Sequence, residues 1–179
     1  MPHVTSFAIA AALFGLSATP ASASYWEKGH WRVQTTDTGS CEVRTGGDGN
    51  GSLSLHVDPK GFNATLVYEP VYFRGEALPL RDTDEISLIF DGEESWLSSE
   101  VFVSEGTSDW GEPSVEAIMT TGFIGDAVAE LRASNTLIVA RMREGEARVF
   151  DTYLLDGFTA NWLKAAEWCD FDPRALPSS

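Results

Sequence analysis

Few side chains in this chain are suited to nucleophilic or metal chemistry. Beyond residue 23 there are two histidines, His30 and His56, and two cysteines, Cys41 and Cys169. A zinc site made of histidine and cysteine needs three or four ligands. The sequence also lacks the Gly-x-Ser-x-Gly turn that presents a nucleophilic serine. We therefore expect each histidine to be a surface or strand residue, and we assign no catalytic, metal-binding or cofactor-binding residue.

Carboxylates, in contrast, are abundant. The chain has 27 Asp and Glu against 12 Lys and Arg, and its formal net charge is −15. Such a surface repels phosphate backbones and anionic lipids, so a nucleic-acid partner is not expected. Pairs of carboxylates carry out glycoside hydrolysis. A periplasmic hydrolase that uses a carboxylate pair or His56 is therefore one alternative to a non-enzymatic protein.

Two acidic stretches have features of divalent-cation sites. Asp48-Gly-Asn50-Gly-Ser52 has the opening spacing of a calcium loop, but Pro59 stands where an EF-hand needs its last acidic ligand. This pattern favours a Gly-rich hairpin loop. The other stretch is an acidic run, and the usual meaning of such a run is a solvated surface. It comprises Asp82, Asp84, Glu85, Asp91, Glu93 and Glu94. A divalent-cation-binding domain is thus a second alternative.

Two tryptophans lie in polar loops, in Glu94-Ser95-Trp96-Leu97 and in Ser108-Asp109-Trp110-Gly111. Aromatic residues in such loops are enriched at binding surfaces. They can also form the lid of a hydrophobic core. We take Trp96 and Trp110 as candidate contacts with an unknown protein or cell-envelope component.

The first 23 residues have the features of a secretory signal peptide. Residues 7–18 form an apolar run, and Ala21-Ser22-Ala23 is an A-x-A cleavage pattern. The run is shorter than the roughly 20 residues that a membrane span needs. We therefore expect cleavage after Ala23, a mature chain that begins at Ser24, and a periplasmic or secreted location without a membrane span.

In an exported chain, the two remaining cysteines predict a disulfide. A bridge between Cys41 and Cys169 would tie the first strands to the last helix. Two buried free thiols are the alternative. Acidic neighbours such as Glu42 and Asp170 argue against a reactive thiolate, which needs a basic environment.

The apolar pattern predicts many short strands. Leu53, Leu55 and Val57 alternate with polar residues, as in a strand with one buried face. Other strands are expected over 31–36, 40–45, 62–69, 71–73, 86–91, 100–104 and 115–119. Residues 25–30 are interpreted as a lead-in.

The last third of the chain predicts a hairpin between two helices. Residues 136–142 and 146–155 are rich in β-branched and aromatic side chains, and Gly145 suits the turn between them. The helices are expected over 122–133 and 158–169, with Cys169 facing inward. Together these patterns predict one mainly β, antiparallel β-sandwich-like domain over residues 24–179, with two short helices near the C-terminus.

The closing stretch also resembles a known family. The matching residues are Ala129-Glu-Leu131, Leu137-Ile-Val139, Val149-Phe150, Leu154-Leu-Asp-Gly-Phe-Thr-Ala160 and, near the start, Trp31-Arg-Val33. They are similar to the invasion-associated locus B family of bacterial secreted proteins. The resemblance implies an exported β-sandwich-like protein without known catalytic residues, in a family where some members are associated with host-cell entry. It also implies packing roles for Gly157 and Phe158. We therefore expect a non-enzymatic domain that needs no cofactor and binds a protein or envelope partner.

Overall fold

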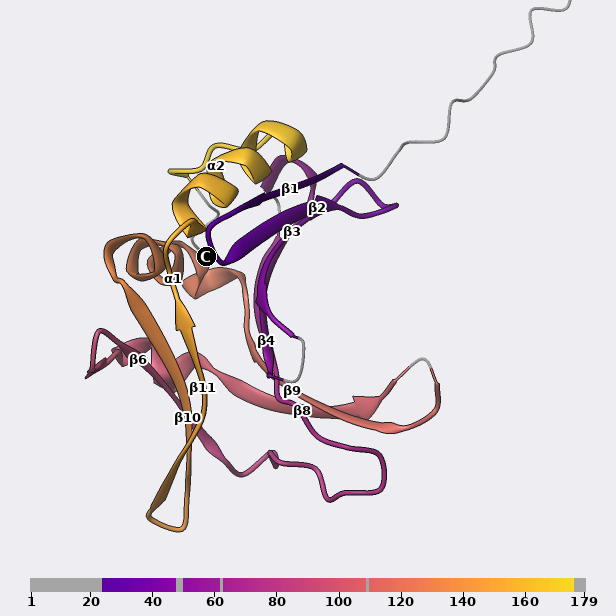
Figure 1. Cartoon of the computed structure of the whole chain (residues 1–179), viewed down its shortest axis with the longest axis vertical. Helices are drawn as coiled ribbons and strands as arrows, with labels where there is room; N and C mark the ends of the chain where they lie inside the picture. Colours follow the sequence, from indigo (N-terminus) through magenta and orange to yellow (C-terminus); the bar gives the residue numbers. More distant parts are fainter. Residues whose placement is uncertain (1–23, 48–49, 62, 109, 176–179) are drawn as a thin grey trace, which may run out of the picture.

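Two antiparallel sheets make up most of the chain (Figure 1). The computed structural model describes residues 24–47, 50–61, 63–108 and 110–175. Within these ranges it has eleven strands and two α-helices, and both helices lie near the C-terminus. The predicted fold class, a mainly β, sandwich-like domain, is therefore confirmed. The predicted signal peptide over 1–23 and Asp48 of the calcium-like loop lie outside the described residues.

The larger sheet has the strand order β1-β2-β3-β4-β5-β9-β8. Its strands are β1 (Tyr25–Lys28), β2 (Trp31–Thr35), β3 (Cys41–Gly46), β4 (Ser52–Val57), β5 (Ala64–Glu69), β8 (Phe102–Thr107) and β9 (Pro113–Met119). Val33, Val43 and Leu55 pair in register and are all buried on one face. A shift of one residue would expose this whole set, so the alternation fixes the register. The sheet is strongly curved, and none of the described helices or strands covers its concave face (Figure 1).

The smaller sheet has the order β11-β10-β6-β7. Its strands are β6 (Glu85–Phe90), β7 (Glu93–Glu94), β10 (Thr136–Arg143) and β11 (Glu146–Leu154). The predicted hairpin is formed by β10 and β11. At its turn, Glu144 and Gly145 have φ angles of 51° and 82°, the positive pair that a two-residue hairpin loop of type I′ requires. A register shift between Val139 and Ala140 marks a β-bulge in this hairpin.

Helices and the smaller sheet cover the convex face of the larger sheet (Figure 1). Helix α2 (Phe158–Cys169) contacts β1, β2 and β3, and α1 (Thr121–Ala133) contacts β5. Two short 3₁₀ helices, η1 (Pro59–Gly61) and η2 (Trp96–Glu100), complete the elements of the described chain. Under α2, the fully buried rings of Trp31 and Phe158 meet edge to face at 4.8 Å. The predicted disulfide joins Cys41 on β3 to Cys169 at the end of α2.

Three local predictions are wrong. Residues 25–28 form β1 instead of a lead-in, because Trp26 pairs with Val33 and packs against the core. Residues 71–73 form no strand, because both Val71 and Phe73 are exposed and the segment has no strand partner. The strand expected over 100–104 begins at residue 102, after η2. Among the described residues, no helix is long and apolar enough to cross a membrane.

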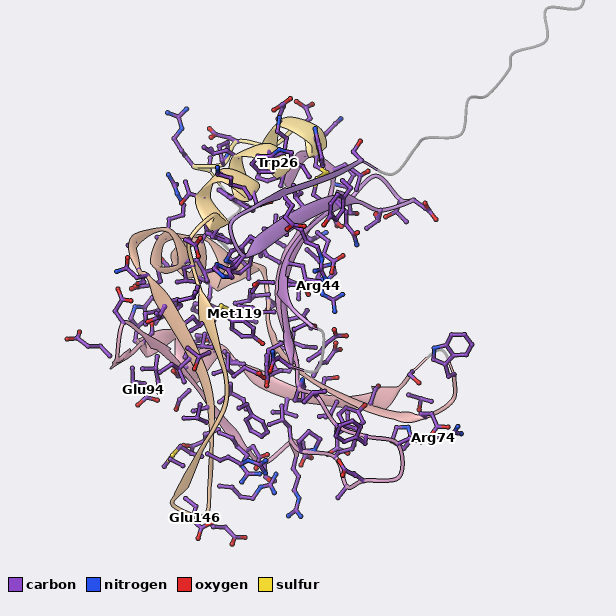
Figure 2. The ribbon with its side chains drawn as sticks, in the orientation of Figure 1. Trp26, Arg44, Arg74, Glu94, Met119 and Glu146 are labelled. Carbon is purple, nitrogen blue, oxygen red and sulfur yellow. A yellow bond between two sulfur atoms is a disulfide. The ribbon has the colours of Figure 1, made fainter. Side chains whose placement is uncertain are left out.

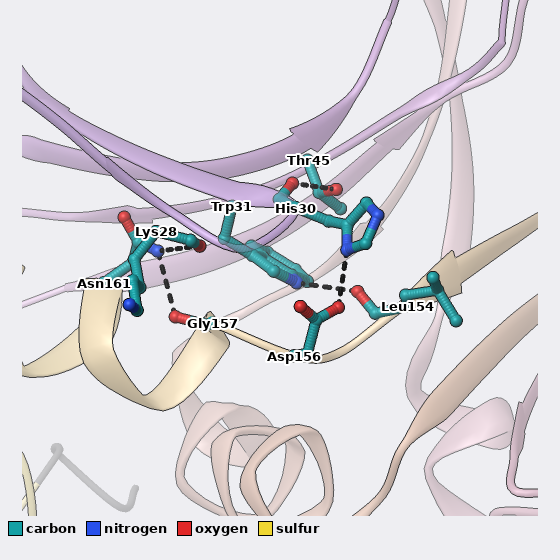
Figure 3. Close-up of polar contacts among 8 residues, drawn as sticks. All are labelled: Lys28, His30, Trp31, Thr45, Leu154, Asp156, Gly157 and Asn161. Atoms are coloured by element: carbon teal, nitrogen blue, oxygen red, sulfur yellow. Dashed lines mark hydrogen bonds and ion pairs between the residues drawn. The ribbon is translucent and has the colours of Figure 1, made fainter.

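The start of α2 meets the β1–β2 turn at a junction that only small residues permit (Figure 3). A Cβ on Gly157, which has a φ of 91°, would lie 2.0 Å from the carbonyl oxygen of Lys28. A Cβ on Gly29 would lie 2.4 Å from the carbonyl oxygen of Asp156. The Asn161 side chain donates to the Lys28 carbonyl at 3.0 Å, and the Trp31 indole donates to the Leu154 carbonyl at 3.0 Å. The backbones are thus in direct contact at this junction.

We predict that Gly157→Ala destabilises the protein by about 3 to 5 kcal/mol, because it combines a positive φ with a clash against backbone. Gly145→Ala is the matched control for the φ angle. It has a φ of 82° but no atom within 4 Å of the added Cβ, so its cost should be about 1 to 2 kcal/mol. Chemical denaturation of both variants measures the difference. Equal losses would show that close approach at the junction contributes nothing.

Candidate binding site at the β8–β9 hairpin

The two candidate tryptophans lie on different parts of the molecule. Trp110 is 90% exposed at the tip of the β8–β9 hairpin. Trp96 is 58% exposed on η2, where its ring meets Phe123 of α1 edge to face at 6.2 Å. Arg74, which pairs with Glu112 near Trp110, and Glu94, two residues before Trp96, lie on opposite sides of the molecule in Figure 2. The two tryptophans therefore do not share one contact surface.

Trp110 belongs to a site that the sequence did not indicate as a whole. It lines a hollow of about 540 Å³ together with Tyr72, Glu69 and Glu116. It also lines an adjoining hollow of about 730 Å³, to which Phe73 contributes. We call these five residues the Trp110 site. Its aromatic wall comes from two separate segments, because Tyr72 and Phe73 precede β6 whereas Trp110 joins β8 to β9.

Polar contacts hold the two segments together. The Tyr72 hydroxyl donates to the Pro113 carbonyl at 2.9 Å, and Arg74 pairs with Glu112. The hairpin tip is closed by its own backbone, in which the amide of Ser108 donates to the carbonyl of Glu112 at 2.8 Å. Phe73 is left 71% exposed. Exposed apolar rings on a tethered loop are unusual on a protein surface, and residues of this kind form the energetic centre of many interfaces.

Two carboxylates form the other wall of the site. Tyr68 pairs in register with Ala117. Because β5 and β9 are antiparallel, Glu69 and Glu116 are the next positions that face each other on these strands. Burial raises the pKa of the Glu116 carboxyl, the negative charge of Glu69 raises it further, and His56 partly opposes both effects. The Glu69 carboxylate accepts a hydrogen bond from the Ser52 hydroxyl at 2.8 Å. Like charges placed this closely favour either a proton or a cationic partner between them.

No protein-family model matches the chain, and no curated protein matches it at a significant level. The function of the Trp110 site must therefore be inferred from its own geometry.

His56 lies near this site, on the open face of the larger sheet. Its Nε2 atom is 3.0 Å from the hydroxyl of Ser54. Figure 2 shows Arg44 on the same concave side, where its guanidinium lies 3.6 Å from Glu42 and 3.7 Å from Glu69. Ser54 is only 3% exposed. A substrate could not reach this hydroxyl without a rearrangement, so the geometry does not favour a serine nucleophile activated by His56.

His30 has a different environment. It lies in the β1–β2 turn, and its Nδ1 atom lies 2.5 Å from a carboxylate oxygen of Asp156 at the junction with α2 (Figure 3). Its carbonyl accepts a hydrogen bond from the Thr45 hydroxyl at 2.7 Å. His30 thus links the N-terminal hairpin to the segment that leads into α2, and His30 and His56 belong to separate contacts.

The acidic run is divided among separate contacts. Burial raises the pKa of Asp84, but hydrogen bonds from Arg143 and from the Arg81 amide outweigh it and leave this pKa below its usual value. The Asp91 carboxylate accepts the amides of Asn135 and Thr136, both at 2.9 Å. Glu94 accepts a hydrogen bond from Ser87 at 2.6 Å. In the part of the chain that the structure describes, no group of three or more His, Cys, Asp or Glu is arranged to hold a metal ion.

We predict that Glu116→Gln stabilises the folded protein at neutral pH. A carboxyl whose folded-state pKa is raised binds more protons when folded, so its contribution to stability falls as pH rises through its titration. The gain should therefore disappear in acid, below the unfolded pKa of about 4.3. Urea unfolding at neutral and acidic pH measures the effect. Glu105→Gln, on exposed β8, is the control and should change little; an equal gain in both variants would contradict the prediction.

Proposed function

We propose that this chain is an exported, disulfide-clamped domain that binds a protein or cell-envelope partner through the Trp110 site. The observation that carries the proposal is the exposure of Trp110 and Phe73, 90% and 71%, beside a hollow with two carboxylates. A ring this exposed contributes little to the stability of the free domain. It would gain most from being covered by a partner.

Export is supported by two independent features. Disulfides form and persist mainly in oxidising compartments, and Cys41 is bonded to Cys169. The A-x-A pattern before Ser24 and the preceding apolar run are typical of a cleaved signal peptide. The resemblance of the closing stretch to the invasion-associated locus B family is consistent with the same location. We propose membership of that family, with a role at the host interface as an extension of it.

The expected partner segment is basic and partly apolar. Glu69 and Glu116 line the first hollow and Glu112 lines the second. Glu112 already pairs with Arg74, and Glu69 lies near Arg44, whereas Glu116 forms no ion pair in the described chain. A lysine or arginine side chain of the partner could pair with Glu116 while its aliphatic part packs against the Trp110 ring. The net charge of −15 would speed the encounter with a basic partner. It would also repel anionic polymers, so a basic protein segment is a better candidate than an acidic polysaccharide.

We predict that Trp110→Ala weakens partner binding by about tenfold or more while changing unfolding free energy by less than about 0.5 kcal/mol. Trp96→Ala should lower the unfolding free energy and leave partner binding unchanged, because the Trp96 ring packs on Phe123. A photo-crosslinking residue at position 73, in cells that export the protein, captures the partner, and its crosslinks should disappear when Trp110→Ala is added.

The control is the same photo-crosslinking residue at position 163, since Leu163 is 48% exposed on α2. Crosslinks from position 73 that match those from position 163, or that persist in Trp110→Ala, would remove the Trp110 site as the contact surface. Unfolding of Trp110→Ala would show instead that this ring belongs to the core.

A second candidate function is glycoside hydrolysis by Glu69 and Glu116. The specific observation is the raised pKa of Glu116 beside a second carboxylate in the same hollow. A carboxyl of raised pKa next to a second carboxyl is the kind of pair that this reaction uses. In this case the aromatic residues would bind the sugar rings.

Hydrolysis predicts release of reducing ends from envelope polysaccharides by the purified wild-type domain. Glu116→Gln should lose at least about a hundredfold in rate, the range expected for removing a general acid. Glu105→Gln should retain full activity. Binding without turnover by the wild-type protein would leave the Trp110 site as a recognition site and exclude this candidate.

A further inference from the structure

The few basic residues of this acidic chain are not spread evenly. Three arginines of the β10–β11 hairpin, Arg141, Arg143 and Arg148, line one hollow of about 360 Å³. The hollow lies between the hairpin and residues 71–79, and Phe150 also lines it. We call it the arginine hollow. It is separate from the hairpin tip that carries Trp110, although Tyr72 borders both places.

Arg141 and Arg148 face each other across the two strands of the hairpin. They are direct cross-strand partners in the register of β10 and β11. Both guanidinium groups lie over the Phe150 ring, 5.9 Å and 5.2 Å from its centre. In the described chain neither one forms an ion pair. Like charges placed directly opposite on adjacent strands destabilise a sheet. This pairing therefore lowers the stability of the free protein.

The acidic residues near the hollow are already engaged. Both oxygens of Asp84 accept hydrogen bonds from Arg143 at 2.6 Å. Asp151 accepts the Tyr68 hydroxyl at 2.5 Å and the Gly51 amide at 3.2 Å. Glu76 is exposed and accepts the amide of Phe73. In the described chain none of these three carboxylates lies within ion-pair distance of Arg141 or Arg148.

Arg141 also has an unused donor. Its Nη1 atom donates to the Pro79 carbonyl at 3.2 Å. Its Nε atom is buried and has no hydrogen-bond partner among the described residues. A buried donor without a partner costs free energy comparable to a lost hydrogen bond. An oxyanion bound between the two guanidinium groups would reduce the repulsion between Arg141 and Arg148.

We propose that the arginine hollow binds a small organic anion, a carboxylate or phosphate group carried on an apolar body. The two guanidinium groups would hold the oxyanion, since Arg binds carboxylate and phosphate with paired donors. Phe150, Tyr72 and Leu78 would contact the apolar body. A volume of about 360 Å³ falls within the usual range for small-molecule sites. The proposal does not depend on the partner of the Trp110 site.

Benzoate and phenyl phosphate test the proposal and distinguish the two anions. Each is added to the full-length mature protein at matched ionic strength, with sodium chloride and benzyl alcohol as controls. At least one anion should raise the thermal midpoint above both controls, because a ligand specific to the folded state stabilises it. The same anion should shift the Nε–Hε resonance of Arg141 in an NMR titration. No shift with either anion would overturn the proposal.

Arg148→Gln gives the decisive comparison. Without ligand it should be at least as stable as wild type, because the cross-strand repulsion is removed. It should also weaken binding of the active anion by about tenfold, the loss of roughly 1.4 kcal/mol. Arg132→Gln, on the exposed side of α1, should leave binding unchanged. If Arg148→Gln binds as tightly as wild type, Arg148 does not hold the anion and the proposed site does not exist. If both variants weaken binding equally, general charge explains the effect, which also overturns the proposal.

Discussion

The packing of α2 on the first three strands depends on a backbone contact between residues far apart in sequence. Gly29 and Gly157 allow the β1–β2 turn to meet the entry to α2 so closely that any side chain at Gly157 would strike the Lys28 carbonyl. The disulfide from Cys41 to Cys169 fixes the other end of the same helix. The chain-entropy model gives such a long loop about 4 to 5 kcal/mol of stabilisation. With α2 held at both ends, Trp31 and Phe158 are enclosed between helix and sheet.

This clamp lies at one end of the larger sheet, and the Trp110 site lies at the other (Figure 1). The convex face of the sheet buries apolar residues on the five consecutive strands β2, β3, β4, β5 and β9. Its concave face therefore carries the alternate residues, which are mainly polar, including Arg44, His56 and Glu69. The β8–β9 hairpin extends this face beyond the core. A rigid support with an exposed aromatic tip is an arrangement in which binding residues can vary at little cost to stability.

Local pattern was sufficient for much of this fold. Alternation in β4 and the helical spacing of Phe158, Trp162 and Cys169 are short-range signals, and so is Gly145 at the hairpin turn. The candidate site depended on longer-range information. Trp110 was identified by its polar neighbours, but the hollows that it lines with Tyr72 and Phe73 depend on a loop whose apolar pattern resembles that of a strand. Nothing in the sequence places Glu69 beside Glu116, since their proximity follows from the pairing of β5 with β9.

The arginines of the β10–β11 hairpin also show that local sequence pattern does not reveal which side chains meet. Arg141, Arg143 and Arg148 are close in sequence, but only the hairpin register puts Arg141 opposite Arg148 and only the fold brings Asp84 to Arg143. Arg143 forms an ion pair with Asp84, whereas Arg148 forms none in the described chain. Tyr72 borders the arginine hollow as well as the Trp110 site, so a substitution of Tyr72 would affect both. Trp110 and Arg148 each border only one of the two places, and their effects can therefore be assigned without ambiguity.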